Sequence, residues 1–428
     1  MSVPTPEELA SLAYERFRIL PKTGKPADTE WTILSAILLY KQIEAEAQVI
    51  AIGCGTKCIG KSKLCNRGLI LNDCHAEVLA RRAFMRYIYY HLKKAAQTTL
   101  REDNIFLWDS ERMVFRLRPH LSFHFFSTHT PCGDACIARD SYKRQQHHNN
   151  DEPVVSKKRK IDIDEPSYDV GHVPTSTTAI NLIYTGAKLI GLDEQQDIME
   201  QSIGAMRTKP GRGDRTLSMS CSDKLARWNV LGVQGALLDV LLSEPIYFET
   251  LNFCGSVHNK YELRCAIYER FSNGNFVSNK YKVQKPVIRT TKDVMFEYAQ
   301  GAKRPNPSST GLIWCNIDQQ LKPYEVAVNG KRLGVTKKKL RTPHASLNVS
   351  KYHLMAEFVE LLRLKPEFLK KLKISQNELQ SLKYNQCKQL ANEYQTAWTL
   401  AKQNYFKQWT QKPADLLKFC LISDEMLT

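Results

Sequence analysis

Two short motifs constrain the fold more than any other feature, because together they offer ligands for a transition metal. The first, Cys74-His75-Ala76-Glu77, opens a predicted helix over residues 74–92, with Asn72-Asp73 as the N-cap pair. The second, Pro-Cys-Gly-Asp-Ala-Cys, occupies residues 131–136, where the proline favours the first turn of another helix. A fold that uses both motifs must bring two distant segments to one point.

The residue types in these motifs suit zinc and proton transfer. One neutral imidazole and two thiolates neutralise Zn²⁺ and leave a fourth position open for water. Zinc lowers the pKa of that water to about 7, and a neighbouring carboxylate can then move its proton. We therefore expect His75 and Cys132 to be ligands and Glu77 to carry protons. Cys136 is a possible further ligand, although it would lie on nearly the same helix face as Cys132. A surface His-x-Glu pair without metal is the common alternative.

The composition narrows the class of protein. Lys and Arg number 61 against 44 Asp and Glu, a net charge of +17, which suits a polyanion such as RNA but also a merely well-solvated surface. No apolar run reaches the roughly 18 residues that span a bilayer, and the first 20 residues lack a signal peptide's apolar stretch. We expect a nuclear or cytoplasmic protein that is neither secreted nor membrane-bound. Its 12 cysteines are then thiols or metal ligands.

Helical and strand patterns interleave, which predicts an α/β fold followed by a helical C-terminal part. Helices are predicted within the first 20 residues and over 31–43, 74–92, from 131, over 221–228 and over 376–409; strands over 47–52, 119–127, 276–287 and 324–328. Residues 140–174 are polar and aperiodic, which predicts a disordered basic insertion. Its run Lys157-Lys158-Arg159-Lys160 is a candidate nuclear import signal or ordinary loop charge.

Three longer motifs resemble the adenosine-to-inosine RNA-editing deaminases. They are Gly55-Thr-Lys-Cys58, Asn72-Asp-Cys-His-Ala-Glu-Val-Leu-Ala-Arg-Arg82 and Ser218-Met-Ser-Cys221-Ser-Asp-Lys-Leu-Ala-Arg-Trp-Asn-Val-Leu-Gly-Val-Gln-Gly235. The resemblance implies a single deaminase domain over residues 1–428, with a cytidine-deaminase-like core in which helices flank a central mixed sheet. It also implies a zinc ion held by His75, Cys132 and Cys221, with Glu77 as proton shuttle. Cys136 then becomes a buried thiol.

About 50 residues precede the first of these motifs, too few for the double-stranded-RNA-binding domains of the messenger-RNA editases. The chain therefore resembles the tRNA-specific adenosine deaminase 1 group, which converts the adenosine at position 37, beside the anticodon of alanine tRNA, to inosine. No obligate protein partner is evident. The candidate RNA contacts are Thr56, Lys57, Arg207, Arg212 and Arg215.

Two other functions remain open from the sequence. One is the editing of double-stranded or messenger RNA by the same chemistry. The other is a catalytically silent RNA-binding protein that uses zinc and an inositol phosphate for structure. Glu77 argues against the second, because a purely structural zinc site does not need it.

The resemblance also implies a buried inositol hexakisphosphate enclosed by the helical C-terminal part. Its ligands by motif match are Asn72, Arg81, Arg82, Lys224, Arg227, Lys331, Tyr384, Lys388, Tyr394 and Lys412. Trp398 stands where the family can place another basic ligand, and Lys402 is the candidate replacement. A polar relay toward the zinc would run through Asp73, Lys209, Lys224 and Gln234. Lysines that simply extend to water are the alternative.

Overall fold

The computed structural model describes residues 3–97, 104–137, 186–190, 204–211, 214–254, 260–272, 276, 278–339 and 342–421. The predicted insertion at 140–174, its basic run at 157–160 and Arg212 lie outside the described residues. All 12 cysteines are free thiols, as the sequence predicts. Within the described ranges, every helix is too short or too polar to cross a bilayer.

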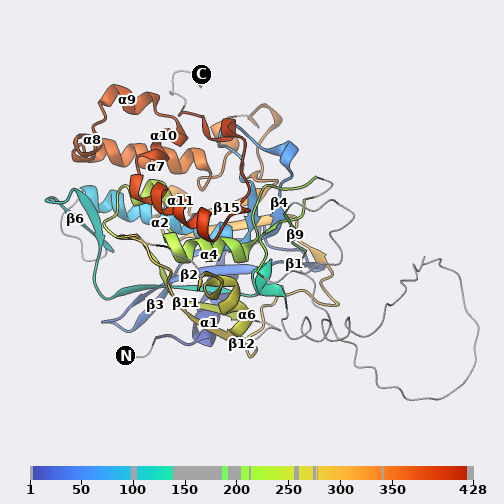
Figure 1. Ribbon diagram of the computed structural model, residues 1–428. Coiled ribbons are helices and arrows are strands. Elements are labelled where there is room, and N and C mark those ends of the chain that lie inside the picture. Colours follow the sequence, from blue (N-terminus) through green and yellow to red (C-terminus); the bar gives the residue numbers. More distant parts are fainter. Residues whose placement is uncertain are drawn as a thin grey trace, which may run out of the picture.

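An eight-stranded mixed sheet lies at the centre, with helices on both of its faces (Figure 1). The strand order is β12-β11-β8-β2-β3-β14-β15-β16; the first three strands are parallel and the remaining pairs antiparallel. Their bounds are β2 Leu34–Lys41, β3 Glu46–Cys54, β8 Leu121–Ser127, β11 Phe248–Cys254, β12 Val287–Thr291, β14 Thr310–Cys315, β15 Tyr324–Val328 and β16 Lys331–Arg332. This arrangement confirms the predicted α/β fold with a central mixed sheet.

Helix α1 (Pro6–Ile19) packs on one face of the sheet and α2 (Ala76–Gln97) on the other. The C-terminal helices α7 to α10 lie beyond α2 in Figure 1, on the side away from the sheet. The other helices among the described residues are α4 Cys221–Leu231, α5 Gly235–Asp239, α6 Lys260–Ile267, α7 Lys351–Leu364, α8 Glu367–Leu372, α9 Gln376–Ser381, α10 Tyr384–Gln389 and α11 Asn392–Asn404.

Short elements complete the description. Four two-stranded pairs are β1 Glu30–Trp31 with β13 Asn306–Pro307, β4 Thr56–Cys58 with β5 Asp73–His75, β6 Phe106–Asp109 with β7 Val114–Leu117, and β9 Lys188–Leu189 with β10 Arg207–Thr208. The 3₁₀ turns are η1 Lys61–Lys63, η2 Asp134–Cys136, η3 Glu269–Phe271, η4 Gln319–Leu321, η5 Lys337–Lys339, η6 Pro343–Ala345 and η7 Ala414–Leu417.

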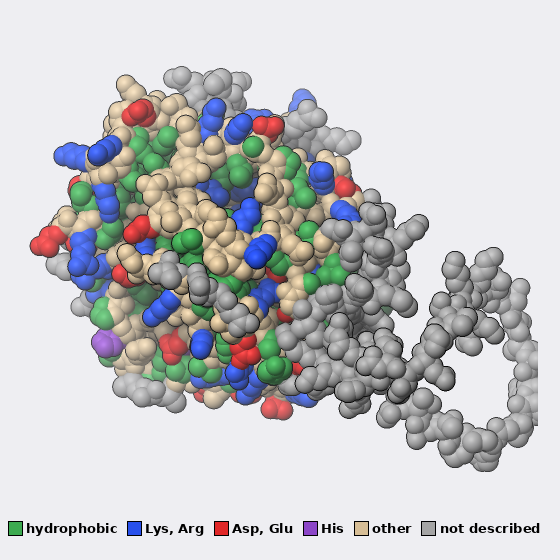
Figure 2. Space-filling model, viewed as in Figure 1, with side chains coloured by type: hydrophobic (Ala, Val, Ile, Leu, Met, Phe, Trp, Pro, Cys, Tyr) green, Lys and Arg blue, Asp and Glu red, His purple; other side chains and the backbone are tan. Residues whose placement is uncertain are grey.

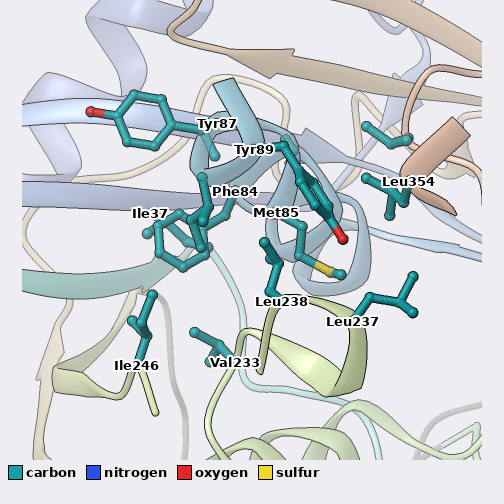
Figure 3. Packing of buried hydrophobic residues seen from close by; sticks show 14 of the residues in the cluster. Ile37, Phe84, Met85, Tyr87, Tyr89, Val233, Leu237, Leu238, Ile246 and Leu354 are labelled. Carbon is teal, nitrogen blue, oxygen red and sulfur yellow. The ribbon is translucent and has the colours of Figure 1, made fainter. Parts of the chain in front are cut away.

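Helix α2 is enclosed on several sides. Figure 3 shows Phe84 facing Ile37 of β2, while Leu238 of α5 approaches from below. Phe84 also meets Phe123 of β8 edge-to-face, with ring centres 4.9 Å apart. On the other side, α2 packs against α7. The first turn of α2, which carries Glu77, is therefore fixed by a close-packed interior.

Four predicted elements were wrong. Residues 34–41 form a strand rather than a helix, because seven consecutive residues are buried and a strand covered on both faces shows no alternation. Residues 131–136 form a 3₁₀ turn instead of an α-helix, since Gly133 adopts φ +108°. The long helix at 376–409 is three shorter helices, and the described part of 276–286 is not a strand. The strands at 47–52, 119–127 and 324–328 and the first helix are confirmed.

A glycine sets how closely the sheet approaches α2. A Cβ atom on Gly53 of β3 would lie 2.3 Å from the Ala80 nitrogen and 2.4 Å from the Ala76 oxygen, both backbone atoms of α2. Gly53→Ala should therefore lower the free energy of unfolding by about 1–3 kcal/mol, because the helix must move away. Gly301→Ala is the matched control, since the added Cβ meets nothing within 4 Å. Equal stability of the two variants by urea denaturation would contradict this.

Candidate metal centre and basic cavity

Three segments bring a histidine and two cysteines together. His75 ends β5, Cys132 follows β8, and Cys221 begins α4 after its N-cap Ser220. Their ligand atoms all lie within 4.8 Å of one another. His75 Nδ1 is 3.9 Å from the Cys132 sulfur and 3.8 Å from the Cys221 sulfur. Donors at zinc–ligand distances around a tetrahedral ion lie about 3.5–3.8 Å apart, so the three side chains fit zinc.

Two buried oxygen atoms beside this group have no hydrogen-bond partner among the described residues. One is Oε2 of Glu77, a side chain that is 2% exposed. The other is Oγ1 of Thr56, which pairs across from His75 in the β4–β5 ladder. Buried polar atoms are almost always satisfied, so both oxygens indicate a place where water or a substrate binds.

Cys136 lies outside the ligand group. Its sulfur faces the carbonyl oxygens of Pro131 and Thr130, at 3.4 and 3.8 Å. Its sulfur is not among the ligand atoms that lie within 4.8 Å of one another, which are those of His75, Cys132 and Cys221. Of the two cysteines considered as the third ligand, the geometry therefore selects Cys221.

A buried lysine joins the metal ligands to an aspartate. Lys209 Nζ donates to the Cys221 sulfur at 3.0 Å and approaches the Asp73 carboxylate at 2.8 Å. Burial opposes the charge on Lys209, yet Asp73, Cys221 and Cys132 raise its pKa well above the ordinary value. A hydrogen bond from Cys221, together with the charge of Lys209, lowers the pKa of Cys132 in turn.

Asp73 also contacts a second lysine, Lys224 of α4. Although burial opposes its ionisation, Lys209 and Lys224 hold the pKa of Asp73 well below the ordinary value. Lys224 lines a separate cavity, so Asp73 connects that cavity with the metal ligands through two ion pairs.

The cavity has a volume of about 500 Å³ and lies among α2, α4 and the segment that ends the chain. Eight Lys and Arg residues line it: Arg81, Arg82, Lys224, Arg227, Lys351, Lys388, Lys402 and Lys412. Asp73 is the one acidic side chain among the described lining residues. The outer surface differs, because Figure 2 shows Lys and Arg distributed over the face with Asp and Glu among them.

The cations in the cavity destabilise one another. Burial lowers the pKa of Lys388 to about 8, with Arg227 adding repulsion, and lowers that of Lys412 to about 8 in the same way. The pKa of Lys351 falls well below its ordinary value, because burial is reinforced by Lys412 and other cations. Buried like charges of this number require a compensating anion. The cavity therefore fits a compact polyanion.

Aromatic rings hold one of these cations in place. The guanidinium carbon of Arg227 is 3.7 Å from the ring centre of Trp398 and 5.1 Å from that of Trp409. Such stacking stabilises a cation by about 0.5–2 kcal/mol. Trp398 therefore orients Arg227 for the cavity instead of supplying a charge of its own.

Residues 51–413 match the adenosine-deaminase (editase) domain family. The chain belongs to this family. It is 46% identical over 422 residues to a Drosophila melanogaster protein named tRNA-specific adenosine deaminase 1, covering 99% of this chain and 98% of that protein. The Homo sapiens protein of the same name is 32% identical over 507 residues, covering 97% and 99%. Double-stranded RNA-specific editase B2 of Mus musculus is 29% identical over 314 residues, covering 72% of this chain and 38% of the editase.

Most of the predicted polyanion ligands of this editase domain meet in the cavity. Asn72, Arg81, Arg82, Lys224, Arg227, Tyr384, Lys388 and Lys412 line it, and Tyr394 lines an adjoining space of about 160 Å³. Lys331 lies on the edge strand β16 and is not among the described lining residues, so its role as a ligand stays a prediction. Lys351, the first residue of α7, was missed; nothing in its local sequence distinguishes it from a surface lysine.

The place of Gln234 in the relay stays a prediction, because its hydrogen bonds run to other residues. Its Nε2 donates to the carbonyl of Leu231 and to Asp239, and its Oε1 accepts from the Ile246 nitrogen. The nitrogen and the oxygen of the Gln234 carboxamide are thus both hydrogen-bonded within the region that follows α4. The contacts of Asp73, Lys209 and Lys224 are continuous without it.

The candidate RNA contacts of the editase domain divide into two kinds. Lys57 and Arg215 are partly exposed near the β4–β5 pair. Arg207 is 2% exposed and ion-pairs with Asp134 at 3.7 Å, so the partner that the structure gives it is a buried carboxylate. A polar sequence context cannot distinguish an arginine that meets RNA from one that meets a buried carboxylate.

The ligand geometry predicts which cysteine matters for metal content. Cys221→Ser should lose most bound zinc. The protein supplies three ligands, one imidazole and two thiolates, and this variant removes one of the thiolates. Cys136→Ser, the matched control in the same interior, should retain zinc. Metal analysis of the purified variants checks this, and zinc loss from Cys136→Ser alone would assign the ligand to Cys136.

Proposed function

We propose that this chain converts adenosine to inosine in tRNA by hydrolysis, at position 37 beside the anticodon of alanine tRNA. The observation that carries the proposal is Glu77, a buried carboxylate with an unpartnered oxygen next to three side chains that fit zinc. The names of full-length relatives support tRNA as the substrate. The editase named for double-stranded RNA aligns over a smaller share of both proteins.

The residues of the site have distinct tasks in this reaction. Zinc, when held by His75, Cys132 and Cys221, supplies a Lewis acid that makes water nucleophilic near neutral pH. Glu77 accepts the two protons of the attacking water in turn, and delivers the first to N1 of the adenine and the second to the departing amino group. Adenosine and water thereby give inosine and ammonia. Thr56 Oγ1 offers a hydrogen bond to the bound nucleoside.

The RNA would approach from the partly exposed side of the β4–β5 pair. An anticodon loop presents unpaired bases, so the target adenosine can enter a buried site at a smaller cost than a base in a duplex. Lys57 and Arg215 are proposed phosphate contacts. Arg212 stays a sequence-based candidate because it lies outside the described residues.

We further propose that the basic cavity holds inositol hexakisphosphate. Its eight cations, one carboxylate and volume of about 500 Å³ suit a small ligand that carries many phosphates. Arg81 and Arg82 come from α2, Lys388 from α10, and Lys412 from the segment after α11. Such an anion would join the C-terminal segment to the helix that also bears Glu77.

Replacement of the proposed proton carrier tests the reaction. Glu77→Gln should lower the rate of inosine formation in alanine tRNA about 10²- to 10⁴-fold, because it keeps the shape but removes the base. Zinc content and melting temperature should stay near those of the parent chain. Inosine is measured by mass spectrometry of nucleosides from the treated tRNA.

The matched control for this experiment is Glu249→Gln, an exposed carboxylate on β11 that should leave the rate unchanged. Full activity of Glu77→Gln would refute the proton-shuttle role. Inosine in a long RNA duplex but not in tRNA would refute the substrate while leaving the chemistry intact.

The lowered lysine pKa values predict how anion binding depends on pH. Lys388 and Lys412 have pKa values of about 8 without the anion, and a bound anion raises them. Above about pH 8, binding must therefore take up protons, so affinity for inositol hexakisphosphate should fall from pH 7 to pH 9.5. Anion-free protein should become more stable over the same range, because its lysines shed unfavourable charge.

Calorimetric titration of anion-free protein measures this dependence. Lys388→Met should weaken binding at pH 7 by about 10- to 100-fold, the loss expected for one charge-assisted hydrogen bond. Lys370→Met, an exposed position on α8, is the control. An affinity that is independent of pH would show that these lysines do not contact the anion.

A further inference from the structure

A buried cluster of four charges joins the two segments that supply the sulfur ligands. Asp134 follows Cys132 by two residues, and Asp223 follows Cys221 by two. Arg270 of η3 contacts both carboxylates: its Nη1 lies 2.7 Å from Asp223 Oδ1, and its Nη2 lies 3.8 Å from Asp134 Oδ2. One guanidinium therefore spans the two ligand-bearing segments.

Arg207 completes the cluster from another direction. Its Nη1 lies 3.7 Å from Asp134 Oδ1, and its backbone nitrogen donates to Asp223 Oδ2 at 3.1 Å. The exposed fractions of the side chains are 2% for Arg207, 10% for Arg270 and 1% for each aspartate. These four side chains carry two positive and two negative charges.

The same cluster also determines where Lys209 lies. The Arg207 carbonyl accepts from the Ser220 nitrogen at 2.8 Å, and the Lys209 nitrogen donates to the Ser218 carbonyl at 2.8 Å. These bonds align the segment that begins at β10 with the residues just before Cys221. Lys209 follows Arg207 by two residues, and in this alignment its ammonium group reaches the Cys221 sulfur.

The cluster does not belong to the basic cavity, whose described lining residues include neither arginine. A buried ion pair is weak evidence for added stability, because the cost of removing both charges from water offsets most of their electrostatic attraction. What the pairs provide is geometry: a planar guanidinium with two donor edges fixes the separation of two carboxylates. Here each carboxylate is two residues from a sulfur ligand.

We propose that Arg270 and Arg207 are positioning residues that fix the distance between the sulfurs of Cys132 and Cys221 for metal binding. The identity of the ion as zinc rests on the proposed function. Contacts just outside a metal's ligands commonly change its affinity about 10- to 100-fold when they are removed. A comparable effect is expected for Arg270, although it touches no ligand atom in any contact that the structure gives.

Replacement of Arg270 tests this role. Arg270→Met keeps the length of the side chain but removes both ion pairs, so the zinc dissociation constant should rise about 10- to 100-fold. Competition with a coloured chelator measures it. Arg264→Met on α6 is the matched control, because Arg264 pairs with Glu269 at the surface with half of its side chain exposed, and zinc affinity should not change.

Charge balance gives a second, independent variant. Arg270→Met leaves two carboxylates with one arginine, a net charge of −1. Adding Asp134→Asn restores neutrality, and the amide oxygen can still accept from the Gly204 nitrogen as the carboxylate does. The double variant should therefore recover part of the lost zinc affinity. If Arg270→Met acted only through a loss of packing, adding Asp134→Asn would not restore affinity.

The absorption spectrum of bound Co²⁺ reports the geometry of the ligands, independently of the folding stability of each variant. At saturating Co²⁺, the sulfur-to-metal absorption bands should shift in Arg270→Met and stay unchanged in Arg264→Met. If Arg270→Met does not fold, Arg270→Lys keeps the charge but cannot span both carboxylates, so it should show the same shift to a smaller degree. Parent-like zinc affinity and cobalt spectra in the folded variants would overturn the proposal. A parent chain that binds no zinc would instead refute the proposed function.

Discussion

The structure depends on the ammonium group of Lys209, which is buried between a carboxylate and a sulfur. An unpaired cation in this interior would cost several kcal/mol. Asp73 and Cys221 remove that cost, and each comes from a different part of the chain. Folding must therefore bring β5, the segment after β10 and the start of α4 together before the charge is satisfied. The same step places His75 and Cys221 within ligand distance of each other.

Helix α2 extends this arrangement from the metal centre to the basic cavity. Glu77 lies in its first turn and Arg81 one turn later, about 6 Å along the axis at 1.5 Å per residue. The helix is packed against the sheet and α7, so Glu77 and Arg81 cannot move independently. A polyanion that binds Arg81 and Arg82 would consequently restrict the position of the proposed proton carrier.

Residue chemistry alone indicated His75, Cys132 and Glu77, because few side chains bind zinc or transfer protons. From the sequence, Cys221 could be selected over Cys136 only by resemblance to the family, because the number of residues between two segments does not give their distance in the folded protein. The strand at 34–41 was mistaken for a helix because a fully buried strand has no polar face to mark its period. Lys351 was not predicted, and Arg207 was predicted only as an RNA contact, because the sequence does not show the distant residues that each of them meets.

Residues that follow α11 form part of the wall of the cavity. Arg227 meets Tyr394 across 167 residues, and Thr410 bonds Leu217 across 193. During synthesis on the ribosome, these late residues emerge after the metal ligands and most of the sheet. The basic interior would therefore face solvent until the final helices dock, and that interval is when an anion could enter. If the cavity holds the proposed anion, its supply in the cell would then influence how much folded protein forms.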